Sequence, residues 1–130
     1  TNTTSARDLA HTIALVDTGE KLSPRARDLY REILSKSSTN TLIPSGLLIG
    51  LGKGQTSADP DADLLAAGIT TYNKTGDIGI AYADAALIQL PNGQRAVAAF
   101  MVKGPFNDPR SAELIRAMAA TVSRALVLQP

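Results

Sequence analysis

Cysteine is absent from this chain of 130 residues, and histidine occurs once, as His11. The lack of cysteine excludes disulfide frameworks, thiolate metal sites and cysteine nucleophiles. With a single histidine, a zinc site is not expected either, so we predict no metal and no other cofactor. His11 falls beside the apolar stripe of a predicted helix, where a surface or half-buried histidine is the usual interpretation.

The chain also lacks a long apolar run and an excess of basic charge. Its longest apolar run, Ala96–Val102, is far shorter than the roughly 20 residues that span a bilayer. Lys and Arg number 13 against 12 Asp and Glu, and they are spread along the chain, which argues against a nucleic-acid surface. The apolar fraction of 44% is typical of one globular domain, or of one contiguous piece of a larger domain. Because the chain begins at Thr1 without methionine or a signal segment, we expect that a preceding stretch was removed or left out.

Local signals in the first half predict two helices and then a loop. Ser5 and Asp8 have capping-box spacing, and Gly19 ends the first helix. Ser23-Pro24 begins a second helix, so residues 1–37 are predicted to form a helical hairpin. Residues 41–69 are rich in glycine, serine and aspartate and predict a long loop with at most a short helical turn. The predicted inward face of the second helix consists of Ala26, Leu29, Tyr30 and Ile33.

The second half predicts three antiparallel strands over residues 70–103 and a helix over residues 108–127. The strands are expected at Thr70–Gly76, Ile80–Leu90 and Arg95–Lys103, and Asn92-Gly93 is a strong hairpin signal between the last two. Apolar residues of the third strand occupy both parities, so both of its faces should be covered. The fold class is therefore α+β, with the C-terminal helix packed on the sheet.

Two other motifs in the sequence are incomplete. Gly50–Gly54 suggests a phosphate loop, but Gly54 stands where a serine or threonine is needed after the lysine. Asp59, Asp61 and Asp63 alternate like the start of an EF-hand loop, yet Leu64 replaces the required glycine. We interpret these carboxylates as solvated loop residues.

Lys74-Thr75-Gly76 is the informative motif. It closes a predicted strand and is followed by a second strand, the Asn-Gly hairpin, a third strand and a terminal helix. In this setting a Lys-Thr-Gly motif lines the active site of penicillin-recognising serine enzymes. The similarity covers residues 2–10, 42–47, 74–79, 82–88 and 90–93. The chain thus resembles the C-terminal part of class A serine β-lactamases and their class-A-like D,D-peptidase relatives.

The resemblance implies roles for four consecutive residues. Lys74 would hold the substrate carboxylate and a proton-shuttling serine, and the Thr75 hydroxyl would donate to the same carboxylate. Gly76 has no Cβ and lets the substrate backbone approach. Asp77 stands where a backbone N–H forms half of the oxyanion hole. Its carboxylate departs from the small or hydroxyl residues usual in efficient β-lactamases and should weaken the binding of an anionic substrate.

Arg7 is the remaining candidate substrate-binding residue. The strand after the motif carries no arginine, whereas some family members place an arginine early in the helix after the Ω-loop, where Arg7 stands. A planar guanidinium suits a carboxylate bidentately. An equal alternative is that Arg7 pairs with Asp8 or solvates the helix surface.

Ser-x-x-Lys and Ser-Asp-Asn, which carry the family's nucleophile and proton shuttle, do not occur in the chain. We expect them upstream of Thr1, so the chain alone lacks the catalytic serine. The predicted function is that of the C-terminal segment of a hydrolase that opens the β-lactam ring through an acyl-serine intermediate. Two alternatives stay open: a D-Ala-D-Ala peptidase-type penicillin-binding protein, acting on peptidoglycan stem peptides, and a non-catalytic module.

The resemblance also implies partners and a location. The family's sheet has more strands than the three predicted here, so we expect a complementing N-terminal segment or self-association at an open sheet edge. An extracytoplasmic location is expected. The stretch 47–69 is longer than is usual in the family and should reshape the edge of the site.

Overall fold

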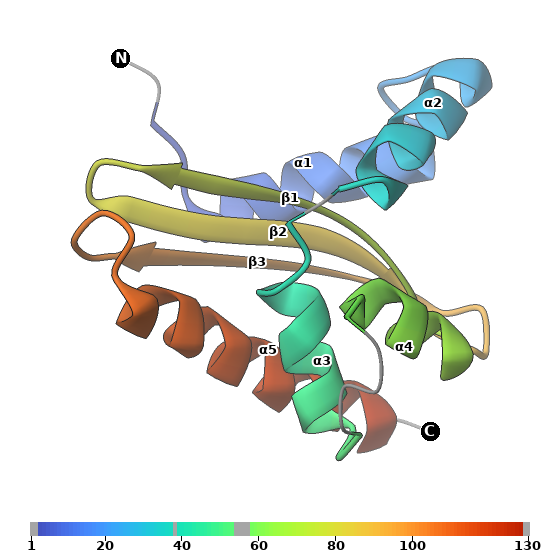
Figure 1. Ribbon diagram of the computed structural model, residues 1–130. Helices are drawn as coiled ribbons and strands as arrows, with labels where there is room; N and C mark the ends of the chain where they lie inside the picture. The colour runs from blue at the N-terminus through green and yellow to red at the C-terminus, as the bar shows by residue number, and fades with distance from the viewer. Residues whose placement is uncertain (1–2, 38, 54–57, 129–130) are drawn as a thin grey trace.

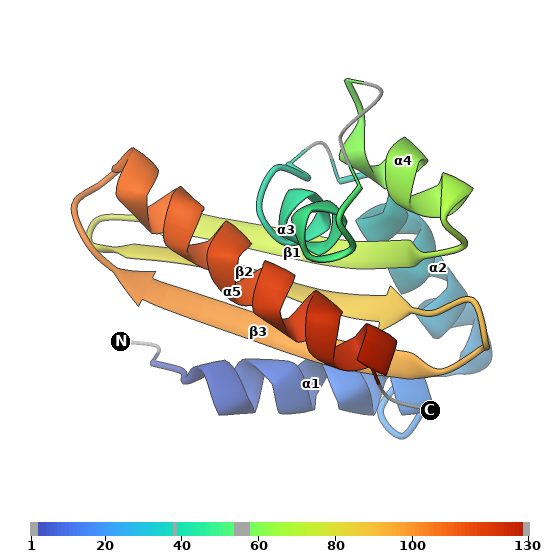
Figure 2. The same cartoon turned by 90° about the horizontal axis from the view of Figure 1, so that it is seen from below.

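The computed structural model describes residues 3–37, 39–53 and 58–128, and its fold is α+β. Strands β1 (Thr70–Ile78), β2 (Ala81–Gln89) and β3 (Arg95–Lys103) form one antiparallel sheet in the order β1-β2-β3. Helices α1 (Ala6–Thr18) and α2 (Pro24–Ser35) lie on one face of the sheet. Helices α3 (Ile43–Gly50), α4 (Pro60–Ala66) and α5 (Pro109–Leu128) lie on the other (Figures 1 and 2). None of the described helices combines the length and apolar composition that a bilayer crossing requires.

The predicted boundaries of the first two helices are confirmed. The Ser5 hydroxyl accepts a hydrogen bond from the Asp8 N–H at 3.1 Å, and the Ser23 hydroxyl accepts one from the Ala26 N–H at 3.2 Å. Gly19 ends α1 with a φ of 80°, a conformation that residues with a Cβ rarely adopt. The two helices follow one another as predicted, but they pack on different strands, α1 on β2 and β3 and α2 on β1.

The predicted inward face of α2 is right for Ala26 and Tyr30, which are half-buried, and wrong for Leu29 and Ile33. Leu29 and Ile33 are 55% and 62% exposed, whereas Leu34 is buried. The apolar periodicity is present, but no described part of the chain covers that side of the helix. Leu29 and Ile33 therefore face solvent, and Leu34 is the buried side chain of the helix.

The predicted turn between β2 and β3 occurs, and a second tight turn joins β1 to β2. At the β2–β3 turn the Gly93 N–H donates to the Leu90 carbonyl at 3.0 Å, and Gly93 alone takes a positive φ, of 83°. At the β1–β2 turn, Gly79 occupies the first of two loop positions with a φ of 53°, which favours glycine. Both faces of β3 are covered as predicted, by α1 on one side and α5 on the other.

The prediction of a loop over residues 41–69 is wrong, because the described part of this stretch contains α3 and α4 (residues 54–57 lie outside the described residues). The glycines that suggested a loop allow α3 to approach α5 closely. A Cβ on Gly46 would lie 2.6 Å from the Arg116 carbonyl oxygen. Because α3 is buried on most sides, its sequence shows no amphipathic period.

Helix α4 begins at the aspartates that were interpreted as solvated loop residues. The Asp59 side chain caps the helix by accepting the Asp61 N–H at 3.1 Å. Asp61 in turn accepts the Thr71 hydroxyl at 2.8 Å, which ties α4 to β1. Leu64 of α4 is fully buried in the core between the sheet and α3.

Candidate functional site

The Lys-Thr-Gly tripeptide lies in the second half of β1, an edge strand of the sheet. β1 pairs with β2 on one side, and no other described strand pairs with its outer edge. Lys74 and Gly76 are exposed, while Thr75, between them, is half-buried. The outer edge of β1 therefore presents unpaired backbone groups to a ligand.

Lys74 supplies a positive charge at this edge. Its Nζ donates to the Thr75 carbonyl oxygen at 2.7 Å, so the ammonium group lies close to the strand. Among the described residues, no carboxylate forms an ion pair with it. The charge is thus available to an anionic ligand.

Gly76 and Asp77 continue the edge. A Cβ on Gly76 would meet no described atom within 4 Å, so the space beside this glycine is open. Asp77 is half-buried, and its Oδ1 is shielded from solvent and has no hydrogen-bond partner within the described structure. A carboxylate oxygen in this state is costly, because it has lost water without gaining a donor.

Arg7 and His11 lie on α1, which packs on β2 and β3 and not on the strand that carries the tripeptide. Both side chains are exposed, and no hydrogen bond or ion pair joins Arg7 to another described residue. The structure therefore brings Lys74, Thr75, Gly76 and Asp77 together on one strand, and Arg7 stays a separate candidate.

The comparisons with known proteins identify the family of the chain. The sequence profile of the β-lactamase enzyme family matches residues 1–126. The chain belongs to the β-lactamase enzyme family. This match confirms the predicted resemblance to the C-terminal part of class A β-lactamases. At the level of the family, it supports a serine β-lactamase-like hydrolase.

Solved structures extend the match. The structure of PBP-A is 46% identical, with a TM-score of 0.79, over 99% of this chain and 42% of that one. A PBP-A variant, solved as an acyl-enzyme complex with penicillin G, matches equally well. A class A β-lactamase from Bacteroides cellulosilyticus is 20% identical, with a TM-score of 0.66, over 95% of this chain and 41% of that one, and shows the shared fold. This β-lactamase-family chain thus spans less than half the length of these structures. Comparison with curated protein sequences finds no match.

Sequence reasoning missed one functional candidate in this family member, the buried carboxylate of Asp84 in β2. Asp84 has no solvent exposure. Its Oδ2 accepts the Ile43 N–H at 3.0 Å, and its Oδ1 accepts Asn73 Nδ2 at 3.1 Å. Asn73 Nδ2 also lies 2.9 Å from the Thr39 carbonyl oxygen, to which it donates. A lone aspartate within the apolar stretch 83–88 was the available signal.

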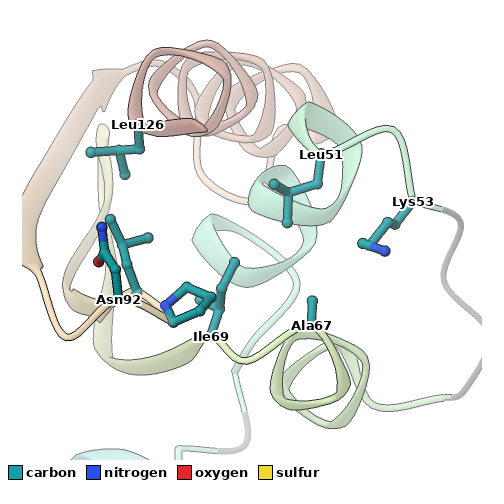
Figure 3. A pocket seen from close by; sticks show the side chains of 8 residues that line it. Leu51, Lys53, Ala67, Ile69, Asn92 and Leu126 are labelled. Atoms are coloured by element: carbon teal, nitrogen blue, oxygen red, sulfur yellow. The ribbon is translucent and has the colours of Figure 1, made fainter. Parts of the chain in front are cut away.

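An apolar hollow lies away from the tripeptide. It is an apolar cavity of about 310 Å³ at the end of the sheet where β1 begins, between the C-terminal ends of α3, α4 and α5. Leu51, Ile69 and Leu126 line it, and the side chains of Lys53 and Asn92 stand on opposite sides (Figure 3). Since Lys74 is in the second half of β1, this cavity is not part of the Lys-Thr-Gly wall.

Proposed function

We propose that this chain supplies the substrate-binding wall of a serine hydrolase that opens β-lactam rings through an acyl-serine intermediate. The observation that carries the proposal is the outer edge of β1, with which no other described strand pairs. There Lys74 has no described carboxylate partner, and the space beside Gly76 is open, in a β-lactamase-family chain. The nucleophilic serine is expected outside these residues, since no Ser-x-x-Lys occurs among them.

The chemistry assigned to the wall follows from the residues. An acyl transfer needs an anchor for the substrate and donors for the oxygen that becomes negative when serine attacks the carbonyl. Lys74 holds the substrate carboxylate electrostatically, and the Thr75 hydroxyl donates a hydrogen bond to it. The Asp77 backbone N–H donates to the developing oxyanion, and the absence of a Cβ on Gly76 lets the substrate lie along β1.

A peptidase-type penicillin-binding protein is the second candidate. The 46% identity to PBP-A, against 20% to the class A β-lactamase, favours it. Asp77 points the same way, because a carboxylate beside the binding edge disfavours an anionic β-lactam. Both candidates share acylation and differ in deacylation, which depends on residues outside this chain. A non-catalytic module is the third candidate, and a natural polypeptide with eroded Ser-x-x-Lys and Ser-Asp-Asn motifs would favour it.

The remaining expectations concern partners and location. The described sheet has two open edges, at β1 and β3, and a complementing segment or a second copy is proposed to pair with the outer edge of β3. An extracytoplasmic location follows from the family resemblance, and no cofactor is needed for acyl transfer to serine.

Labelling with a fluorescent penicillin, followed by denaturing electrophoresis, tests the proposal. The intact protein, meaning the natural polypeptide that carries these residues with a Ser-x-x-Lys region, should label, and the 130-residue chain alone should not. Lys74→Ala should slow labelling of the intact protein by about two to four orders of magnitude. An unchanged rate in a folded Lys74→Ala variant would overturn the assignment of β1.

Arg7 is tested by steady-state kinetics on a chromogenic cephalosporin. As an anchor remote from the breaking bond, it should affect ground-state binding, so Arg7→Ala should raise KM with little change in kcat. Arg25→Ala, at an exposed arginine of α2, is the matched control. Identical constants for the two variants would assign Arg7 to the solvated helix surface.

A further inference from the structure

The hydrogen bonds of Asp84 converge on the strand that carries the candidate site. Asn73, which donates to Asp84, directly precedes Lys74, and Thr75 is the Cα partner of Asp84 in the β1–β2 register. Asp84 is therefore hydrogen-bonded to the residue of β1 that precedes Lys74 and stands opposite Thr75, the residue that follows it. As an edge strand, β1 has one ladder to fix its position, so a side-chain clamp at this point restrains it further.

Asp84 also fixes the start of α3. The N-cap residue Leu42 makes no side-chain hydrogen bond to the helix, and Asp84 from β2 accepts the N–H of the first helical residue, Ile43. A carboxylate at a helix N-terminus is favoured by the helix dipole. The Asp84 side chain thus joins β1 to α3, and Asn73 extends the link to the Thr39 carbonyl in the segment before α3.

We propose that Asp84 is a positioning residue for Lys74 and Thr75, acting through Asn73. The inference rests on the proposed function of β1 as the substrate-binding wall. It assigns Asp84 no contact with substrate, because the side chain is completely buried.

Few charged groups surround Asp84. Helix α3 carries none, β3 places the uncharged Phe100 opposite it, and β1 contributes Lys74, whose charge attracts the carboxylate. From α5, Arg116 donates to the Thr41 carbonyl at 3.1 Å, just before α3. The protonation state of Asp84 is therefore set mainly by its own burial and hydrogen bonds.

Burial raises the pKa of Asp84 to about 6, against the opposing effect of hydrogen bonds from Ile43, Asn73 and Ala85 and of the Lys74 charge. Above this pH, both oxygens of the carboxylate accept hydrogen bonds. Protonation turns one oxygen into a donor that faces N–H groups, so the clamp weakens as the pH falls.

Nuclear magnetic resonance of the 130-residue chain tests the clamp without reference to activity. The Ile43 amide, the Asn73 side-chain amide, the Thr75 amide and the Lys74 side-chain signals should titrate with one midpoint near the pKa of Asp84, about 6. Asp84→Asn should abolish this transition. Asp17→Asn, at another buried carboxylate, should leave it intact. Lys74 and Thr75 signals that do not follow the Asp84 midpoint would overturn the inference.

Asn73→Ala separates the two hydrogen bonds of the clamp, the one to Asn73 and the one to Ile43. It is also the test variant if Asp84→Asn fails to fold. It removes the link to β1 and leaves the Ile43 hydrogen bond, so the Ile43 amide should still titrate while Lys74 and Thr75 no longer follow it. If all three signals titrate as before, Asn73 does not transmit the effect, and the inference is wrong.

Acylation kinetics of the intact protein distinguish this inference from the proposed function. Asp84→Asn should lower the acylation rate about tenfold, as small misplacements of catalytic groups do, and should remove an acid limb near the Asp84 pKa of about 6 from the pH profile. If Lys74→Ala slows acylation but Asp84→Asn has the wild-type rate and profile, the positioning role fails and the function stands. If Lys74→Ala has no effect while the resonances still titrate together, the function fails and the clamp stands.

Discussion

The guanidinium of Arg95, at the start of β3, lies 3.1 Å from the carboxylate of Asp17, near the end of α1, although 78 positions separate them in the chain. Asp17 is only 8% exposed, and Arg31 of α2 forms an ion pair with it as well. One carboxylate therefore joins α1 to both α2 and the sheet.

Removing the charge of Asp17 should weaken the fold. Asp17→Asn leaves two arginines around a neutral amide, and we expect the free energy of unfolding to fall by about 1–3 kcal/mol, below the range for fully buried pairs because Arg95 is half-exposed. Urea denaturation measures the loss. Asp28→Asn, at an exposed aspartate of α2, should change stability by less than about 0.5 kcal/mol. Equal stability of the two variants would contradict this prediction.

The pH dependence of stability should report Asp84. Since burial raises its pKa from 3.8 to about 6, the folded state binds a proton more tightly than the unfolded state in that window. This contribution is fully present below the unfolded pKa and is lost as the pH rises through the folded pKa, a decline of roughly 3 kcal/mol at most. Asp84→Asn should lack the decline, so its stability relative to the wild type should improve as the pH rises. Urea denaturation across this range would contradict the prediction if the difference stayed constant.

Gly46→Ala should destabilise the protein although alanine is the better helix former. The added Cβ would overlap both the Ala119 side chain and the Arg116 carbonyl, and α3 would have to move away from α5. Overpacking of this kind costs about 1–3 kcal/mol and outweighs the helix-propensity gain of about 1 kcal/mol, so we expect a net loss of up to about 2 kcal/mol. Ile49→Ala, on the exposed side of the same helix, is the control and should be nearly neutral in thermal denaturation. A stabilised Gly46→Ala variant would show that α3 and α5 are not in close contact.

The exposed stripe of α2 should matter for association and not for the stability of this chain. Leu29→Gln with Ile33→Gln should change the free energy of unfolding by less than about 1 kcal/mol and reduce self-association in sedimentation velocity, because both side chains already face solvent. Leu34→Ala, one position further along at a buried site, should cost about 2–4 kcal/mol. A large loss of stability in the double variant would mean that α2 is rotated with respect to this structure.

Asp77→Ser should improve turnover of an anionic β-lactam by the intact protein. The change removes a like charge beside the binding edge and keeps the backbone N–H, and we expect kcat/KM on a chromogenic cephalosporin to rise by up to about tenfold. It also removes a shielded oxygen that has no hydrogen-bond partner in the described structure, so stability should not fall. Asp77→Asn separates charge from size. A decrease in kcat/KM for both variants would show that the carboxylate has a positive role.

Prediction from sequence succeeded where the signal is local. Ser5 and Ser23 cap their helices, Gly19 ends α1, and the Asn92-Gly93 turn sets the β2–β3 hairpin, because each depends on the conformational preferences of a few neighbouring residues. The Lys-Thr-Gly tripeptide was found for the same reason, as a short motif after a strand. Its placement on an edge strand of the described sheet, with a lysine that has no carboxylate partner in the described part of the chain, needed the structure.

The start of α4 was missed although its cap, Asp59 before Pro60, is a local signal; the other misses involve residues whose neighbours come from distant parts of the chain. Gly46 suggests a loop when read alone, and only the approach of α5 makes it part of a buried helix. The spacing of Leu29 and Ile33 predicts a buried helix face. Periodicity shows only that the face is apolar, and it does not show whether another part of the chain covers that face.

The sequence by itself determined the order and type of most elements, indicated the family, and suggested residues for binding an anionic substrate. The tertiary structure decided that β1 is an edge strand of the described sheet, and that Asp84, in an apolar stretch of the sequence, becomes a buried acceptor between β1 and α3. The physical reason is that capping, turn and strand preferences are local energies. Burial and hydrogen-bond satisfaction depend instead on segments that meet only after the chain has folded.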